Sequence, residues 1–405
     1  MIGNLGESLS ALKNTNYRRY FIGQAASVTG SWMQSTVQAW LVYRLSHSGA
    51  WLGIITFCLQ MPAFLLSPVA GVLADHSDRR RILIWTSGVG MAQAFLLAFL
   101  VFTNSVQLWH VAVLSVVLGL MTAFDLTTRH AFAVDLVGKK QLPSAIACNS
   151  LIINSSRIIG PALAGILITF LSEGWCFLLN GLSYLAVIGG LLLITIPEGR
   201  KKLLRTGTHL QEIREALTYV KKNRTISGLL WTSTFMSFFG LAFAVLLPVF
   251  AKEQLQGDAS TLAWLTGATG VGAIVGALGG MSHPKFVSQI EARLPLVFIL
   301  LGASLILLGQ SHFLPLSIFA VFGIGLFLMG TFPALNSAIQ QNVDDFLRGR
   351  VLSLYTMSFL GAAPLGGLLA GWASDQIGAS LVQLASGLVF IAASAVLFAF
   401  KRING

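Results

Sequence analysis

The segment GVLADHSDRRR, residues 71–81, marks the boundary between two long apolar runs, 51–74 and 82–103. About 20 apolar residues are needed to span the hydrocarbon core of a bilayer, and both runs reach that length. Lysine and arginine gather in the cytoplasmic loops of membrane proteins, and this segment ends on three consecutive arginines. The segment therefore predicts a short cytoplasmic connection between two transmembrane helices.

Apolar runs of this kind recur along the whole chain of 405 residues, which is 55% hydrophobic and only 10% charged. Soluble domains carry about 25% charged residues, so a soluble class is excluded. We predict an all-α membrane protein whose twelve transmembrane helices form two six-helix halves. The expected spans are 20–43, 51–74, 82–103, 107–128, 144–170, 175–196, 226–250, 260–281, 294–311, 314–338, 350–373 and 379–400.

The basic residues follow the alternation that these spans impose. Of the 26 lysines and arginines, all but Arg44, Lys252 and Arg157 fall on the same side as residues 71–81. This bias places both termini in the cytoplasm, as an even number of spans requires. It also explains the net charge of +11 without a nucleic acid, so we expect the bilayer, and no nucleic acid, as a partner.

A connection at 197–225 divides the chain into an N-terminal half, 1–196, and a C-terminal half, 226–405. Within it HLQEIREALTYVKKNR places apolar residues on one helical face, which predicts an amphipathic helix on the membrane surface. The apolar residues are Leu210, Ile213, Leu217 and Val220. The halves also share a weak repeat, because RIIGPALAGIL at 157–167 matches FLGAAPLGGLLAG at 359–371. Repeated halves are typical of transporters that bind substrate near the bilayer midplane.

The sequence offers no catalytic or metal site. Cys58, Cys148 and Cys176 all fall in expected spans without metal or redox spacing. A phosphate-binding loop is absent as well. We expect no enzyme activity, no cofactor and no metal, so any pumping must draw on an ion gradient or on a partner.

Residues 71–81 resemble the signature loop of the major facilitator superfamily, G-x-L-a-D-r-x-G-r-k. The matching residues are Gly71, Asp75, Arg79 and Arg80, whereas His76 and Asp78 depart from the pattern. The resemblance implies the major facilitator fold. It also implies a cytoplasmic gate in which Asp75 and Arg79 join an acid on the fourth span. That acid is Asp125 in AFDLTTRHAF, and Arg129 shares its helix face.

Three further segments, 32–46, 123–137 and 157–167, resemble the transmembrane secretion effector branch, which includes the enterobactin exporter and macrolide efflux proteins. This resemblance implies a monomeric exporter of small organic molecules in the bacterial inner membrane, coupled to H⁺ antiport. Gly160, Pro161 and Gly165 resemble the antiporter motif of the fifth span, and Pro364 is their repeat counterpart. We expect these residues to let the helices bend. A lipid flippase or importer on the same fold stays open, as does a non-transporting scaffold or receptor.

Arg157 is a charge within an expected span. It lies thirteen residues from the start of its span at 144, or about 20 Å along a helix. A charge at that depth is costly in lipid, so we expect it to face a substrate cavity, with Asn154, Gln34, Gln38 and Asn180. The alternative is a structural role, in which Arg157 binds backbone carbonyls or Asp125. With no central carboxylate, such a cavity favours anionic or neutral substrates.

No carboxylate near the centre of a span presents itself for proton coupling, and Asp125 at a helix end is the best candidate. Ser115 occupies the position at which drug antiporters of the superfamily carry an arginine in the fourth span.

Overall fold

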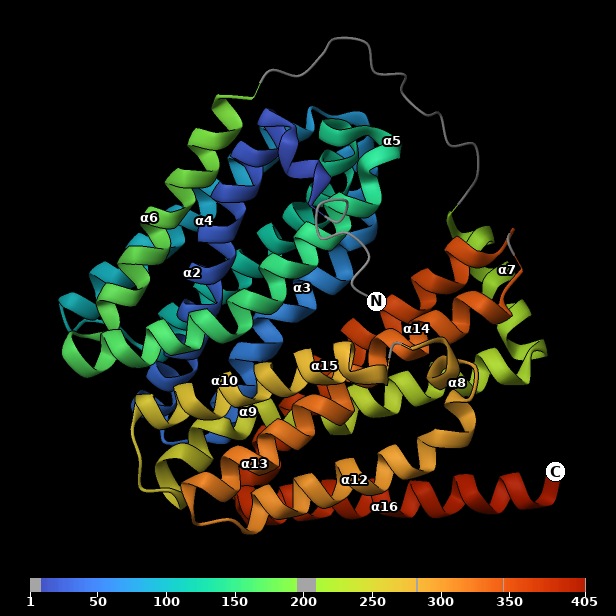
Figure 1. Cartoon of the computed structure of the whole chain (residues 1–405). Coiled ribbons are helices and arrows are strands. Elements are labelled where there is room, and N and C mark those ends of the chain that lie inside the picture. The colour runs from blue at the N-terminus through green and yellow to red at the C-terminus, as the bar shows by residue number, and fades with distance from the viewer. Residues whose placement is uncertain (1–8, 195–208, 282, 345, 405) are drawn as a thin grey trace. The chain divides into compact units, whose positions relative to one another are not determined.

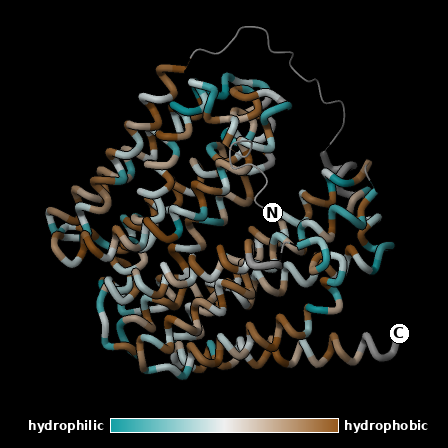
Figure 2. Tube along the Cα trace, in the orientation of Figure 1, coloured by the Kyte–Doolittle hydropathy of each residue, from teal (hydrophilic) through white to brown (hydrophobic). Residues whose placement is uncertain are grey.

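A computed structural model describes residues 9–194, 209–281, 283–344 and 346–404, and the regular structure in these ranges is helical throughout (Figure 1). Apolar residues run along most of the helices (Figure 2). The chain forms two compact units. Unit 1 comprises residues 1–46 and 58–204, and unit 2 comprises residues 47–57 and 205–405.

Unit 1 contains η1 (Ser10–Lys13), α2 (Thr15–Ser46), most of α3 (Gly49–His76), α4 (Arg79–Phe102), α5 (Leu108–Phe170) and α6 (Glu173–Leu192). Helix α5 is 63 residues long because it joins two spans across Gly138, which adopts φ 69°. Glycine reaches this left-handed region without the steric cost that a Cβ imposes. Helix α2 packs against α5 and α6, and α4 packs against the same two helices.

Unit 2 contains the first turns of α3 and the remaining helices. These are α7 (His209–Lys222), α8 (Arg224–Phe235), η2 (Met236–Gly240), α9 (Ala242–Val249), η3 (Phe250–Gln254), α10 (Ala259–Gly276), η4 (Ala277–Met281), α11 (Pro284–Val287), α12 (Ile290–Gln310), α13 (Leu314–Ile324), η5 (Gly325–Met329), α14 (Gly330–Asn342), α15 (Arg348–Ile377) and α16 (Ala379–Asn404). Segments η2 to η5 are single π-helical turns, which interrupt α-helices most often at functional sites. Phe235, Phe298 and Phe390 form an aromatic cluster, with ring centroids 5.1–5.6 Å apart.

Eleven helical segments within the described ranges are long and apolar enough to cross a membrane. Each of them overlaps one of the expected spans, although residues 195–196 of the sixth span lie outside the described residues. The remaining expected span, 20–43, lies in α2, a helix of 32 residues that buries Gln24, Gln34 and Gln38. These glutamines lower its hydropathy, so composition alone does not identify α2 as a span. The chain is an all-helical membrane protein.

Helix α7 confirms a helix in the connection at 197–225, although its buried face differs in part from the expected one. Ala216 and Val220 are buried, whereas Leu217 is 45% exposed. The side chains of Leu210 and Ile213 lie outside the described residues. Glu215 pairs with Arg350 of α15, so this helix packs against another helix of unit 2. A position on the membrane surface stays a prediction.

The start of α3 docks tightly onto the end of α15 within unit 2. A Cβ on Gly371 would collide with the carbonyl oxygen of Gly49, and one on Gly53 would lie 2.9 Å from the carbonyl oxygen of Gly367. Small residues of this kind let membrane helices approach backbone to backbone. At the end of this contact, Asp375 accepts hydrogen bonds from the N–H groups of Gly49 (2.6 Å) and Ala50 (3.2 Å). The carboxylate thus neutralises the positive end of the α3 dipole.

Gly371→Ala should destabilise the protein by roughly 1–3 kcal/mol, because the added methyl overpacks this contact. Gly349→Ala in the same helix is the matched control, since a Cβ there meets open space. That control should be neutral or should raise stability by up to about 1 kcal/mol through helix propensity. Thermal unfolding of both variants in detergent measures the contrast. Equal midpoints would contradict the docking.

Candidate functional site

The interior of unit 1 contains a network of polar side chains that joins its helices. Gln34 of α2 bonds Gln93 of α4 (3.1 Å) and accepts a hydrogen bond from Asn180 of α6 (2.7 Å). Gln38 donates to Ser115 of α5 at 2.9 Å. The exposures of Gln34, Gln38 and Asn180 are 2%, 6% and 2%. The structure therefore places these three expected cavity residues in helix–helix contacts, where hydrogen bonds of this kind hold membrane helices together.

Arg157 lies apart from this network, over the indole of Trp32. Its guanidinium carbon is 5.3 Å from the ring centroid, within the range of a cation–π interaction. Gly160 allows α5 to approach α2 closely beside Arg157. A Cβ at residue 160 would lie 2.9 Å from the Met33 nitrogen and 3.0 Å from the Thr29 carbonyl oxygen. Arg157 forms no ion pair with Asp125, which is bound to Arg129. Asn154 is partly exposed one turn earlier.

The expected helix-bending residues lie within continuous helix. Pro161 and Pro364 are inside α5 and α15, and the non-helical residue recorded inside α5 is Gly138. The carbonyl of Gly165 accepts a hydrogen bond from Thr169 at 2.8 Å. Close packing recurs near both prolines: Gly160 meets α2, and Gly366 meets the backbone of Phe238 in η2. Bending at these positions stays a prediction.

The signature loop is tied to the helices of unit 1. Arg79 donates to both carboxylate oxygens of Asp135 at 3.0 Å. Arg80 donates to the carbonyl of Leu192 at the end of α6 (2.8 Å), where a cation complements the helix dipole. Asp78 caps α4 by accepting from the N–H groups of Arg80 and Arg81.

Gly71 and Asp75 occupy the two remaining positions of the signature loop. A Cβ on Gly71 would meet open space in the described structure, and the side chain of Asp75 lies outside the described residues.

Asp125 and Arg129 form a separate charged pair on α5. Their side chains are 19% and 23% exposed, and Thr86 of α4 donates to Asp125 at 3.4 Å. The expected gate cluster is thus divided, because Arg79 pairs with Asp135 and not with Asp125. Asp135 was the acid that sequence reasoning missed. It stands in AFAVDLV on the same α5 segment, within the reach of a signature-loop arginine.

A further ion pair links the last turn of α2 to the first turn of α6. Arg44 donates from Nε and Nη2 to the two oxygens of Glu173, at 2.9 and 2.7 Å. This two-pronged geometry is the strong form of an arginine–carboxylate pair. It explains why a cation stands on the side that is otherwise poor in basic residues. The sequence signal was that Glu173 and Arg44 are the one acid and the one arginine on that side of the N-terminal half.

A signature loop tied to a polar, membrane-spanning helical unit defines a transporter of the major facilitator type. The fold agrees: the nucleoside transporter NupG matches with a TM-score of 0.75 over 96% of this chain and 98% of that chain, at 15% identity. The chain belongs to the transmembrane secretion effector family, whose model matches residues 6–404. It is a transporter and not an enzyme.

Two relatives match nearly end to end. The staphyloferrin A transporter of Staphylococcus aureus is 25% identical, over 92% of this chain and 93% of its own length. Macrolide efflux protein A of Streptococcus pyogenes is 24% identical, over 91% of this chain and 92% of its own length.

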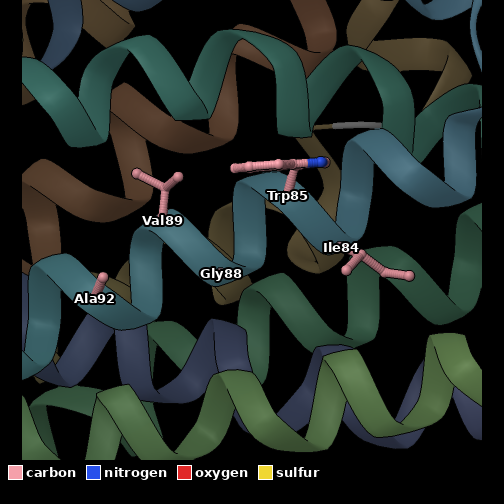
Figure 3. Close-up of a pocket in the computed structure, with 5 residues that line it drawn as sticks. All are labelled: Ile84, Trp85, Gly88, Val89 and Ala92. Atoms are coloured by element: carbon pink, nitrogen blue, oxygen red, sulfur yellow. The ribbon is translucent and has the colours of Figure 1, made fainter.

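A hollow on α4 is a poor candidate for the substrate site. It is lined by Ile84, Trp85, Gly88, Val89 and Ala92, all from this helix (Figure 3). Trp85 is 74% exposed, and its indole N–H is the one polar side-chain group among these five lining residues. A surface of this composition suits acyl chains.

Asp135→Asn should destabilise the protein, because it leaves Arg79, whose side chain is 17% exposed, without its carboxylate. We expect a loss between the roughly 0–1 kcal/mol of an exposed pair and the roughly 3–5 kcal/mol of a buried one. Asp78→Asn is the control, since asparagine keeps the helix cap and loses only the exposed pair with Arg81. Thermal unfolding in detergent compares the two. A control as damaging as Asp135→Asn would contradict a specific role for Asp135.

Proposed function

We propose that this chain is a secondary active exporter of small organic molecules, of the drug, macrolide or siderophore type, that works by alternating access. The observation that carries the proposal is the end-to-end match to a macrolide efflux protein and to a siderophore transporter. The organisation of unit 1 supports it, because its polar interior is more than a passive membrane anchor requires. We place the protein in the bacterial inner membrane as a monomer with both termini in the cytoplasm, as the basic residues favour.

We further propose that export is coupled to proton entry and that Asp125 carries the proton. Asp125 lies on a membrane-spanning helix and pairs with Arg129, whose Nε is buried without a hydrogen-bond partner in the described structure. Protonation of Asp125 would remove its attraction for Arg129 and release the pair. An ion pair that breaks and re-forms is a two-state element of the kind that alternating access needs.

Export is tested by expressing the chain in a bacterial host that lacks its main drug efflux pumps. We expect the minimum inhibitory concentration of at least one macrolide or amphipathic drug to rise, or a siderophore to accumulate in the medium of an expressing strain. Growth on an antibiotic panel and mass spectrometry of the medium give the two readouts. Transport directed inward in everted membranes is the expected direction for an exporter.

Other outcomes of these measurements would contradict the proposal. Uptake into right-side-out vesicles would identify an importer, and transfer of labelled phospholipid between leaflets would identify a flippase. A scaffold or receptor would move no solute, and its helices would show no solute-dependent change in cysteine accessibility.

Asp125→Asn should abolish the proton flux that accompanies transport while the protein stays folded. In everted vesicles with an acidic interior, adding the exported compound should dissipate the pH gradient through the wild-type protein and not through this variant. Asp78→Asn is the control, because Asp78 caps a helix at an exposed position. Wild-type proton flux in the Asp125 variant would refute the assignment of Asp125.

A further inference from the structure

Arg157 has no carboxylate partner among the described residues of unit 1. The described acidic side chains of this unit each pair with a different arginine: Asp78 with Arg81, Asp125 with Arg129, Asp135 with Arg79 and Glu173 with Arg44. The Nε atom of Arg157 is buried and lacks a hydrogen-bond partner in the same ranges. Arg157 is therefore a membrane-embedded cation that the described part of the unit leaves without an anion.

The packing around Arg157 holds it in this unpaired state. Gly160, one turn later, brings α5 against the backbone of α2. The hydroxyls of Ser156 and Thr29 are 2.9 Å apart and tie the two helices together beside it. These contacts direct the guanidinium onto the Trp32 ring, and neither Arg157 nor Trp32 is fully buried. The arrangement holds the arginine against the indole, and the residue stays partly exposed.

An unpaired charge at this depth costs several kcal/mol in a medium of low dielectric constant. The face of Trp32 offsets about 0.5–2 kcal/mol of that cost. An anion from outside the chain removes much of the remainder, because it supplies the acceptors that the described residues do not. The free energy that is left uncompensated therefore favours binding of an external anion. Because no fixed carboxylate in the described part of the unit competes for the guanidinium, that anion can bind and leave again.

We propose that Arg157, positioned over Trp32, binds a carboxylate of the transported molecule. The planar guanidinium matches the two oxygens of a carboxylate, and Arg157 is partly exposed beside the indole of Trp32. This inference rests on the proposed function, since the bound molecule is the substrate. It narrows the expected anionic or neutral substrates to carboxylic acids.

The test uses two probes of the same shape that differ in charge, naphthoate and the neutral naphthamide. Isothermal titration of the purified full chain in a neutral detergent measures both affinities. We expect the wild-type protein to bind naphthoate at least about tenfold more tightly than naphthamide, as one charge-assisted interaction provides. Arg157→Gln should bring this ratio close to one. Arg157→Lys should give an intermediate ratio, because it keeps the charge but loses the paired N–H geometry.

Arg293→Gln is the matched control. Arg293 also lies over an aromatic ring, 4.9 Å from the centroid of Phe286, but in unit 2 and with a hydrogen bond to Gln289. The preference for naphthoate should persist in this variant. Unfolding midpoints near that of the wild type show that each variant is folded, and Trp32→Phe, which keeps an aromatic face, should retain most of the preference.

Several results would overturn the proposal. One is equal affinity for the two probes, or no measurable binding of either. Another is an unchanged ratio in a folded Arg157→Gln variant. A third is displacement of naphthoate by phosphatidylglycerol but not by phosphatidylcholine, which would assign the site to the headgroup of an anionic lipid. Failure of the exporter proposal gives a different result. A protein that binds naphthoate through Arg157 but moves solute inward would support the binding site and contradict only the proposed direction of transport.

Discussion

The structure of unit 1 depends on one constraint: polar groups placed within a membrane must find their partners inside the protein. Water is not available there to satisfy an exposed amide or charge. Gln34 answers the constraint by joining α2 to α4 and α6 at once, and Glu173 by joining α6 to Arg44 of α2. The packing of this unit therefore follows its hydrogen bonds as much as its apolar surfaces. Exceptions remain among the described residues: both side-chain polar atoms of Gln24 are buried without a hydrogen-bond partner, and so is Nε of Arg157.

The two units differ in some of the side chains that pack inside them. Unit 2 contains the aromatic cluster of Phe235, Phe298 and Phe390 and several π-helical turns, where unit 1 contains glutamines and charges. The repeat that the sequence suggests thus preserves packing, since glycines beside Pro161 and Pro364 both meet the first span of their half. It does not preserve chemistry, because Leu360 stands where Arg157 would repeat.

Sequence reasoning predicted the helices well and the side-chain partners less well. Long apolar runs are local signals, so eleven of the expected spans overlap apolar helices of the structure. The signature loop and Asp125 were also local signals. Their pairing, however, depends on which faces of α4 and α5 meet. In the structure these faces bring Arg79 to Asp135. The same limit applies to Gln34, Gln38 and Asn180. Their polarity suggested a cavity, whereas only the packing shows that Gln34 bonds Asn180 and that Gln38 bonds Ser115. Sequence reasoning singled out Arg157 because a charge within a membrane span costs free energy whichever residues surround it.

The central claim is that Arg157 has no anionic partner among the described residues and binds one from outside the chain. An experimental structure of the substrate-free protein in a lipid nanodisc tests it most directly, because the side chains around the guanidinium would be seen. We predict that Arg157 lies on Trp32 with no aspartate or glutamate of the chain bound to it. A carboxylate of the protein hydrogen-bonded to Arg157 would contradict this claim and make the arginine a structural residue.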